Sequence, residues 1–301
     1  MLRQPQAGRP VNGPPVLFDR NRLARQRARA AGSPASAWFL HREAASQVGE
    51  RLAEINRTFY RPAIVGWRSD PWRHWIGLPE ACCCLSHAGM LADTDARHDL
   101  IIHALSLHWE NDPVGELIQS RRALCPDGFL VAVLLGGRTL HELRTALAHA
   151  ESEVEGGLSP RVAPMGDVRD LGNLLPRAGL ALPVADSIEI RTSYESPLKL
   201  MHDLRAMGET NALSARRRTG LRRATLAAAV DHYREHFPAE SGRVSATFEL
   251  IFLSGWAAHD RQPKPLRPGS ATRRLADALG TVEHGPDPAR SSRLDLKDRQ
   301  R

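Results

Sequence analysis

The hydrophobic and polar positions of the chain follow two periods, one typical of helices and the other of buried strands. Residues 38–59 repeat an apolar side chain every three or four positions, which predicts an amphipathic helix. Short, continuous apolar runs are typical of strands that are buried on both faces. Such runs cover residues 62–66, 81–85, 99–105 and 129–135.

Local signals and further periods predict the remaining elements. Asp112 as N-cap and Pro113 in the first turn begin a helix, which the turn-forming residues 125–128 close. Helical periods cover residues 140–154, 168–175, 200–207 and 221–236, and strand-like runs cover residues 180–192 and 244–256. Helices that alternate with short buried strands predict an α/β fold, with a mostly parallel sheet and helices on both faces.

The two ends of the chain differ in composition from the middle. The net charge of the 301 residues is +7, but residues 1–30 alone carry +6 and residues 259–301 carry +4, which leaves −3 for the middle. We therefore expect a basic N-terminal extension (1–35), a folded domain (36–258) and a weakly ordered C-terminal tail (259–301). A groove for nucleic acid needs its basic residues on the folded body, so no nucleic-acid partner is predicted.

Composition excludes several other classes of protein. Hydrophobic residues make up 42% of the chain, enough for a sizeable core. No apolar run reaches the length of a transmembrane helix, and the N-terminus lacks the apolar segment of a secretory signal. Three of the four cysteines are consecutive (Cys82 to Cys84), a pattern of neither a disulfide framework nor a zinc site. Together with lysine at only three positions, this predicts a bacterial cytoplasmic protein with reduced cysteines.

The candidate chemistry follows the strand at 99–105. In open parallel sheets, ligands bind beyond the carboxyl ends of the strands. His108 and Trp109 lie at such a place, where an imidazole can move a proton and an indole can pack on a substrate. The alternative is an exposed histidine beside a tryptophan that packs on the next helix.

Three other motifs are weaker. Gly136-Gly137 predicts either a substrate loop or a strand-to-helix turn. His141-Glu142 begins like a zinc-binding HExxH motif, but Thr145 replaces the second histidine, so no metal site is predicted. The arginines at 216–218 predict either a contact with an acidic partner or, more often, a solvated helix face.

Several segments resemble one known family. The stretch HDLIIHALSLHWENDPVGELIQSRRALCPDGFLVA (98–132) resembles the region after the fourth strand of class I S-adenosylmethionine-dependent methyltransferases. It is most similar to the malonyl-carrier-protein methyltransferases of biotin synthesis and to the complex I assembly factors with arginine hydroxylase activity. The second group is favoured by LFDRNRLARQRARAA (17–31), by GGRTLHELRTALAHAESEVEGGLSPRVAP (136–164) and by DLRAMGETNA (203–212).

The resemblance implies a Rossmann-like fold with a seven-stranded sheet whose last strand is antiparallel. It also implies S-adenosylmethionine as cofactor, bound near Gly66, Asp93 and Leu105, with His108 and Trp109 as catalytic residues beside the substrate. That substrate would be a protein or a carrier-bound group, with a subunit of respiratory complex I as the partner in the assembly-factor branch. A eukaryotic member would reside in the mitochondrial matrix.

The cofactor motif departs from the family pattern. Bulky Trp67 and Arg68 follow Gly66, where glycines let the cofactor approach the backbone. The second strand is followed by Leu85-Ser86-His87, without the carboxylate that holds the ribose. Two functions therefore remain open: a methyltransferase-type enzyme with a degenerate cofactor loop, and a non-catalytic assembly factor or chaperone that keeps the fold.

Overall fold

The computed structural model describes residues 16–93, 97–263 and 273–282. The chain divides into two compact units, residues 1–259 and residues 260–301. The second unit has one helix among its described residues, α10 (Leu275–Leu279). Residues 1–15 of the predicted N-terminal extension and most of the predicted C-terminal tail lie outside the described residues, and the division at residues 35 and 258 stays a prediction.

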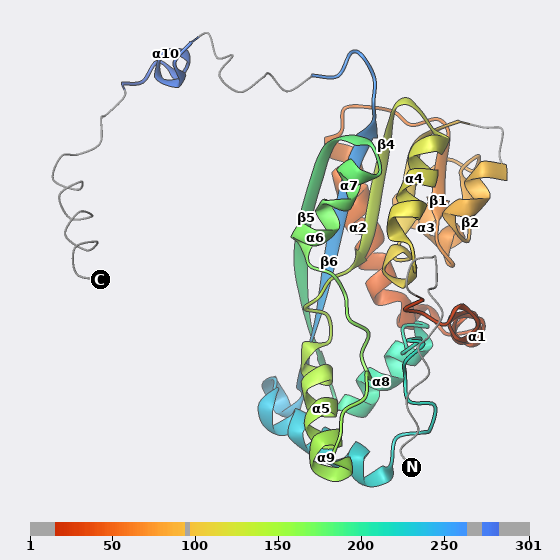
Figure 1. The fold of residues 1–301 in the computed structure, drawn as a ribbon, viewed down its shortest axis with the longest axis vertical. Coiled ribbons are helices and arrows are strands. Elements are labelled where there is room, and N and C mark those ends of the chain that lie inside the picture. Colours follow the sequence, from red (N-terminus) through yellow and green to blue (C-terminus); the bar gives the residue numbers. More distant parts are fainter. Residues whose placement is uncertain (1–15, 94–96, 264–272, 283–301) are drawn as a thin grey trace, which may run out of the picture. The chain divides into compact units, whose positions relative to one another are not determined.

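The first unit is an α/β fold whose elements follow the predicted order (Figure 1). Its strands are β1 (Pro62–Val65), β2 (Cys83–Leu85), β3 (His98–Ala104), β4 (Leu124–Leu135), β5 (Leu180–Tyr194) and β6 (Val244–Ala257). Its α-helices are α1 (Arg20–Ala30), α2 (Phe39–Glu54), α3 (Ser69–Ile76), α4 (Pro113–Ala123), α5 (His141–Glu155), α6 (Val168–Gly172), α7 (Leu174–Arg177), α8 (Pro197–Ala206) and α9 (Arg223–His236). Short 3₁₀ turns are η1 (Ala35–Trp38), η2 (Ala88–Asp93), η3 (Leu107–Trp109) and η4 (Glu240–Gly242).

The strands form one mixed sheet in the order β2-β1-β3-β4-β6-β5. Strands β2, β1, β3 and β4 are parallel to their neighbours, and β6 is antiparallel to both β4 and β5. The antiparallel last strand is therefore confirmed. The predicted boundary after α4 is wrong, because residues 125–128 belong to β4 rather than to a turn that closes the helix.

The prediction of seven strands is not confirmed, since the described residues form six. No described strand lies beyond β2, and the segment that follows β2 forms η2 instead. Side-chain contacts explain this: the Ala88 N–H donates to Glu116 Oε2 of α4 (2.9 Å), and Ala88 and Leu91 are buried in the core. These contacts hold the segment against α4.

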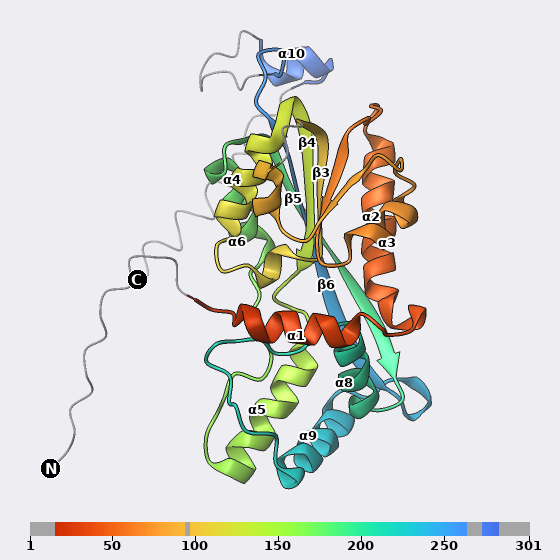
Figure 2. The same ribbon diagram turned by 90° about the vertical axis from the view of Figure 1, so that its right-hand side faces the viewer.

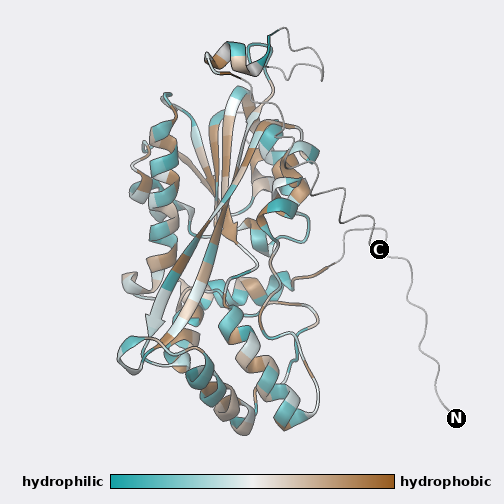
Figure 3. Cartoon of the chain, turned by 90° about the vertical axis from the view of Figure 1, so that its left-hand side faces the viewer, coloured by the Kyte–Doolittle hydropathy of each residue, from teal (hydrophilic) through white to brown (hydrophobic). Residues whose placement is uncertain are grey.

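Helices cover both faces of the sheet, as predicted. Alternate residues of β3 point to opposite faces: Leu100 and Ile102 pack in the core with α2, and Ile101 packs in the core with α4. Figure 3 shows hydrophobic strands between helices that carry hydrophilic residues on their outer sides. The strands β5 (15 residues) and β6 (14 residues) extend beyond the 4-residue β1, and α5, α8 and α9 lie near this extension (Figures 1 and 2).

Candidate functional site

Helix α1 crosses the molecule at the carboxyl ends of the parallel strands, between the sheet and the group of α5, α8 and α9 (Figure 2). Asp19 caps the helix by accepting a hydrogen bond from the Arg22 N–H (2.9 Å). The Gln26 side chain donates to the Asn211 carbonyl (2.9 Å), which ties α1 to the segment after α8. The crevice where open sheets bind ligands is thus covered by a helix of the same chain.

The chain leaves β1 through Gly66, a predicted cofactor contact. The Gly66 N–H donates to the Leu85 carbonyl (2.8 Å) and so joins the ends of β1 and β2. A Cβ at this position would lie 2.7 Å from the Ala104 carbonyl oxygen at the end of β3. Close packing against β3 therefore requires glycine here, independently of any cofactor.

The chain leaves β3 through Leu105, another predicted cofactor contact, which is buried in the core. Its φ of 48° lies in the left-handed region, which is strained for a leucine. The Leu105 N–H donates to the Val133 carbonyl of β4 (3.1 Å), which fixes this conformation. The resulting bend directs the chain into η3, which carries His108 and Trp109.

His108 and Trp109 meet a carboxylate that the sequence analysis did not select, Glu209. The Trp109 indole N–H donates to Glu209 Oε2 (2.8 Å), and His108 Nε2 lies 3.3 Å from the same oxygen. The Trp109 ring also packs edge-on against Phe18 (ring centroids 5.1 Å apart). Both predicted catalytic residues are therefore brought together, but their shared partner comes from the segment after α8. The only available signal was its position inside the family-like segment DLRAMGETNA.

Glu209 is ionised in this setting. Burial by itself would raise the pKa of the Glu209 carboxyl, but the hydrogen bond with His108 and the charges of His108 and Arg27 outweigh it and lower that pKa. Both hydrogen bonds reach Oε2, and among the residues that the structure describes none reaches Oε1. One oxygen of a buried anion is therefore left to accept a hydrogen bond from a ligand.

A pocket of about 170 Å³ adjoins Glu209. Its wall is mostly apolar and comes from β4, α5, α8, β6 and the loop after α5. The lining residues are Leu40, Trp109, Leu135, Leu140, Leu143, Leu147, Arg161, Val162, Ala163, Met165, Met201, Leu204, Glu209, Thr210, Asn211 and Phe248. A long apolar side chain with a polar, positively charged end suits this arrangement.

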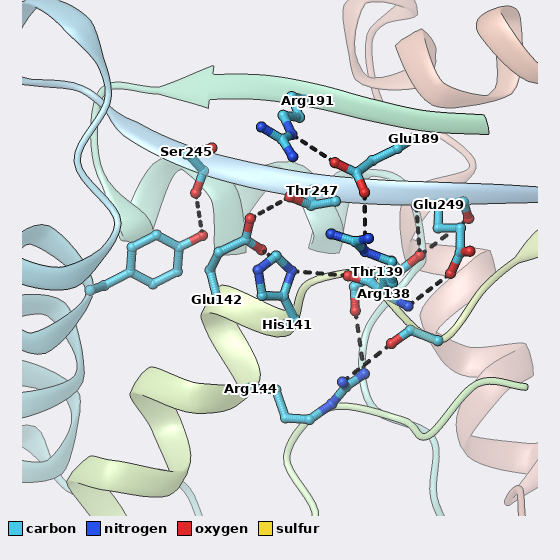
Figure 4. A network of polar contacts seen from close by, with 12 residues as sticks. Arg138, Thr139, His141, Glu142, Arg144, Glu189, Arg191, Ser245, Thr247 and Glu249 are labelled. Carbon is cyan, nitrogen blue, oxygen red and sulfur yellow. Dashed lines mark hydrogen bonds and ion pairs between the residues drawn. The ribbon is translucent and has the colours of Figure 1, made fainter. Parts of the chain in front are cut away.

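The loop that contains Gly136-Gly137 is fixed by hydrogen bonds to β6, and Figure 4 shows those of Arg138 and Thr139 with Glu249. The Gly136 N–H donates to the Glu249 carbonyl (2.9 Å), and the Arg138 N–H donates to Glu249 Oε2 (2.9 Å). Thr139 Oγ1 donates to the Glu249 carbonyl (3.3 Å), and the Leu140 N–H donates to the Thr247 carbonyl (2.8 Å). The loop is thus a fixed strand-to-helix turn that places Leu140 in the pocket wall.

The remaining residues that the sequence analysis singled out are arginines, cysteines and Asp93, and the arginines are paired with carboxylates of the same chain. Arg216 forms an ion pair with Asp19 (3.0 Å), and Arg217 pairs with Glu155. The four cysteines are free, and burial raises the pKa of the Cys82 thiol to about 12. Asp93 lies at the end of η2.

The described residues contain neither a metal-binding cluster nor a membrane-spanning helix. No group of three or more His, Cys, Asp or Glu side chains in this part of the chain could hold a metal ion. Among the same residues, no helix has both the length and the apolar character needed to cross a membrane.

The strand order and the site after β3 define a methyltransferase-like α/β protein, and relatives specify its family. The chain is 35% identical over 287 residues to the arginine-hydroxylase NDUFAF5, mitochondrial, of Danio rerio, covering 87% of this chain and 89% of that protein. It is 33% identical over 302 residues to the Homo sapiens protein of that name, covering 92% and 87%. The chain belongs to the family of these arginine-hydroxylase NDUFAF5 proteins.

The chain is also similar to more distant proteins. The chain is 32% identical over 206 residues to the malonyl-[acyl-carrier protein] O-methyltransferase of Halorhodospira halophila, covering 68% of this chain and 67% of that enzyme. Among solved structures, it resembles the YcgJ protein of Bacillus subtilis (TM-score 0.44, 12% identity, 72% of this chain and 99% of that one). It also resembles the plantazolicin methyltransferase BamL (TM-score 0.37, 11% identity, 79% of this chain and 97% of that one). No protein-family model matches the chain.

Proposed function

We propose that this protein binds an arginine side chain of a partner protein in the pocket beside Glu209. The observation that carries the proposal is Glu209 Oε1, an oxygen of a buried, ionised carboxylate that accepts no hydrogen bond from the described residues and adjoins an apolar pocket. A guanidinium on an apolar stem matches both features, because it offers fixed N–H donors and a positive charge to a carboxylate.

The family supports the same ligand, since the relatives that cover most of the chain are named arginine-hydroxylases. A carrier-bound malonyl group, the substrate named for the more distant relatives, is less suited to this pocket. A malonyl carboxylate would bring a second negative charge against Glu209, and like charges at short range repel strongly in a buried site.

The experiment is a calorimetric titration of the full chain with three peptides that differ at one position, carrying arginine, citrulline or lysine. Citrulline has the shape of arginine without its charge. We expect the arginine peptide to bind at least tenfold more tightly than the citrulline peptide, because a hydrogen bond to a charged group contributes about 1.5–3 kcal/mol. Equal affinities for arginine and citrulline would refute the proposal.

Glu209→Gln is the matching variant, because the amide keeps an oxygen that can accept from the Trp109 N–H but has no charge. We expect it to lose most of the preference for arginine over citrulline. Glu235→Gln, at an exposed position of α9, is the control and should bind like the unchanged protein. A normal arginine preference in Glu209→Gln would show that the guanidinium binds elsewhere.

Partner and location follow from the family and stay proposals. A subunit of respiratory complex I is the partner that we propose for the arginine peptide. The location is the cytoplasm for a bacterial source and the mitochondrial matrix for a eukaryotic one, since the names of the NDUFAF5 relatives include the word mitochondrial. S-adenosylmethionine is the cofactor that the methyltransferase-like relatives imply, and Gly66, Asp93 and Leu105 are the contacts that the sequence resemblance predicts for it.

A further inference from the structure

The loop after β1 is unlike a nucleotide-binding loop. Only Gly66, Trp67 and Arg68 link β1 to α3, and one glycine is followed at once by the largest side chain. Glycines in such loops let a ligand lie against the bare backbone. In this chain the backbone at that place is covered by an indole and a guanidinium.

The Trp67 indole packs against four other segments of the chain near the carboxyl end of β1. Its ring packs edge-on against Trp38 (centroids 5.4 Å apart) and His41 (6.4 Å). Its Cζ2 atom lies 3.3 Å from where a Cβ of Gly208 would be, which places the ring against the turn after α8. The Arg27 guanidinium of α1 lies 5.8 Å from the ring centroid. The indole is thus in contact with α1, η1, α2 and the turn after α8.

Arg68 fixes the loop in this position. Its guanidinium carbon lies 3.8 Å from the centre of the Trp38 ring, and its Nη1 donates to the Ala31 carbonyl at the end of α1 (3.2 Å). The loop and the covering helix are therefore held together by a cation–π contact and a hydrogen bond.

The charges around the indole also disfavour S-adenosylmethionine. The Arg27 and Arg68 guanidinium carbons lie 5.8 Å and 5.6 Å from the centre of the Trp67 ring, and both groups are positive. The sulfonium and the ammonium of the cofactor are positive as well, so both would be repelled. The carboxylate that would hold the ribose is absent from Leu85, Ser86 and His87, the residues that end and follow β2. The residues after β1 and β2 therefore do not fit this cofactor.

We propose that Trp67 permanently fills the cofactor crevice, so that this member of the family does not bind S-adenosylmethionine. The indole packs where the ligand would lie, and it joins α1 and the turn after α8 to the loop that follows β1. This inference concerns the crevice after β1, whereas the proposed arginine pocket lies on the side of β4 and α5.

The test begins with a calorimetric titration of the unchanged full chain with S-adenosylmethionine and with S-adenosylhomocysteine. We expect no binding of either compound at concentrations up to about 1 mM, the range in which specific sites are detected. Binding with a dissociation constant in the micromolar range would overturn the proposal. This titration needs no variant, so it tests the proposal even if a substitution at Trp67 prevents folding.

The second measurement is thermal melting of Trp67→Ala with and without added indole. Removal of the ring should lower the melting temperature by roughly 5–10 °C, and free indole should restore part of the loss by filling the hole. Trp75→Ala, a half-buried tryptophan of the neighbouring helix α3, is the matched control and should show no rescue by indole. An unchanged melting temperature in Trp67→Ala would also overturn the proposal, because the ring would then fill no site. The titration with S-adenosylmethionine and the titration with the arginine peptides are both made on the unchanged protein with different ligands, so the two proposals fail separately.

Discussion

Acid should destabilise this protein in a pH range set by two buried histidines. His103 of β3 is 1% exposed, and its Nε2 lies 2.8 Å from Ser120 Oγ. Ser120 Oγ donates its own proton to the Glu116 carbonyl (2.9 Å), so it accepts from His103, which therefore carries a proton on Nε2. Burial lowers the pKa of His103 from 6.5 to about 4. Burial also lowers the pKa of His41 to about 4, with Arg68, His108 and Arg27 acting in the same direction and Glu209 against them.

The direction of the change in stability with pH follows from proton uptake by the unfolded chain. In the unfolded chain each histidine takes up a proton below pH 6.5, whereas the folded protein resists protonation until about pH 4. The unfolded state therefore binds more protons in this window, and stability falls as the pH drops from 6.5 to 4. At pH 5 the loss relative to pH 7.5 is about 2 kcal/mol for each histidine, or about 4 kcal/mol for the pair.

Urea denaturation at pH 7.5 and at pH 5 measures this loss. His103→Gln keeps an N–H donor for Ser120 but cannot titrate, so its free energy of unfolding should fall about 2 kcal/mol less between the two pH values than that of the unchanged protein. His202→Gln, at an exposed position of α8, is the control and should leave the pH dependence unchanged. If His103→Gln loses as much stability as the unchanged protein, His103 titrates normally in the fold and the reasoning from its burial is refuted.

Two further predictions concern the walls of the site. Gly66→Ala should cost about 1–3 kcal/mol in urea denaturation because its Cβ would lie 2.7 Å from a backbone oxygen, whereas Gly49→Ala, with nothing within 4 Å, should cost nothing. Glu151, 1% exposed, accepts hydrogen bonds from the Ser159 N–H (2.8 Å) and Arg161 Nε (2.7 Å), so Glu151→Gln should cost about 3 kcal/mol and speed amide exchange in residues 159–165. Unchanged exchange there would show that other contacts hold this wall of the pocket.

The sheet could be predicted from the sequence because its strands are continuous apolar runs. β1, β3 and β4 are buried on both faces along most of their length, and nothing but a sheet covered on two sides accounts for such runs. The start of α4 could also be predicted from the sequence. Asp112 precedes Pro113 and caps the helix by accepting a hydrogen bond from the Gly115 N–H (2.9 Å). The absence of a described strand beyond β2 could not be predicted from the sequence. It depends on a contact between Ala88 and Glu116, which are distant in sequence.

Only half of the candidate site could be predicted from the sequence, again because the rest depends on contacts between distant residues. His108 and Trp109 follow a strand directly, so their place at the carboxyl edge could be read from the order of residues. Glu209 follows a helix, and only the folded chain shows that the turn after α8 returns to the end of β3. Trp67 could be recognised as an unusual residue in the loop after β1. That its ring lies inward, against Trp38 and the turn after α8, depends on tertiary packing.

The filled crevice and the open pocket are coupled through one charge. Arg27 belongs to α1, the helix that covers the crevice, and its charge helps to lower the pKa of Glu209 at the edge of the pocket. Burial lowers the pKa of Arg27 itself, and the charges of Glu209 and Glu110 oppose that shift, so the buried cation and the buried carboxylate stabilise each other. A ligand that displaced α1 would remove the cation and leave Glu209 harder to ionise. The helix that packs on Trp67 at one half of the carboxyl edge therefore also helps to keep Glu209 ionised at the other half, where the proposed arginine pocket lies.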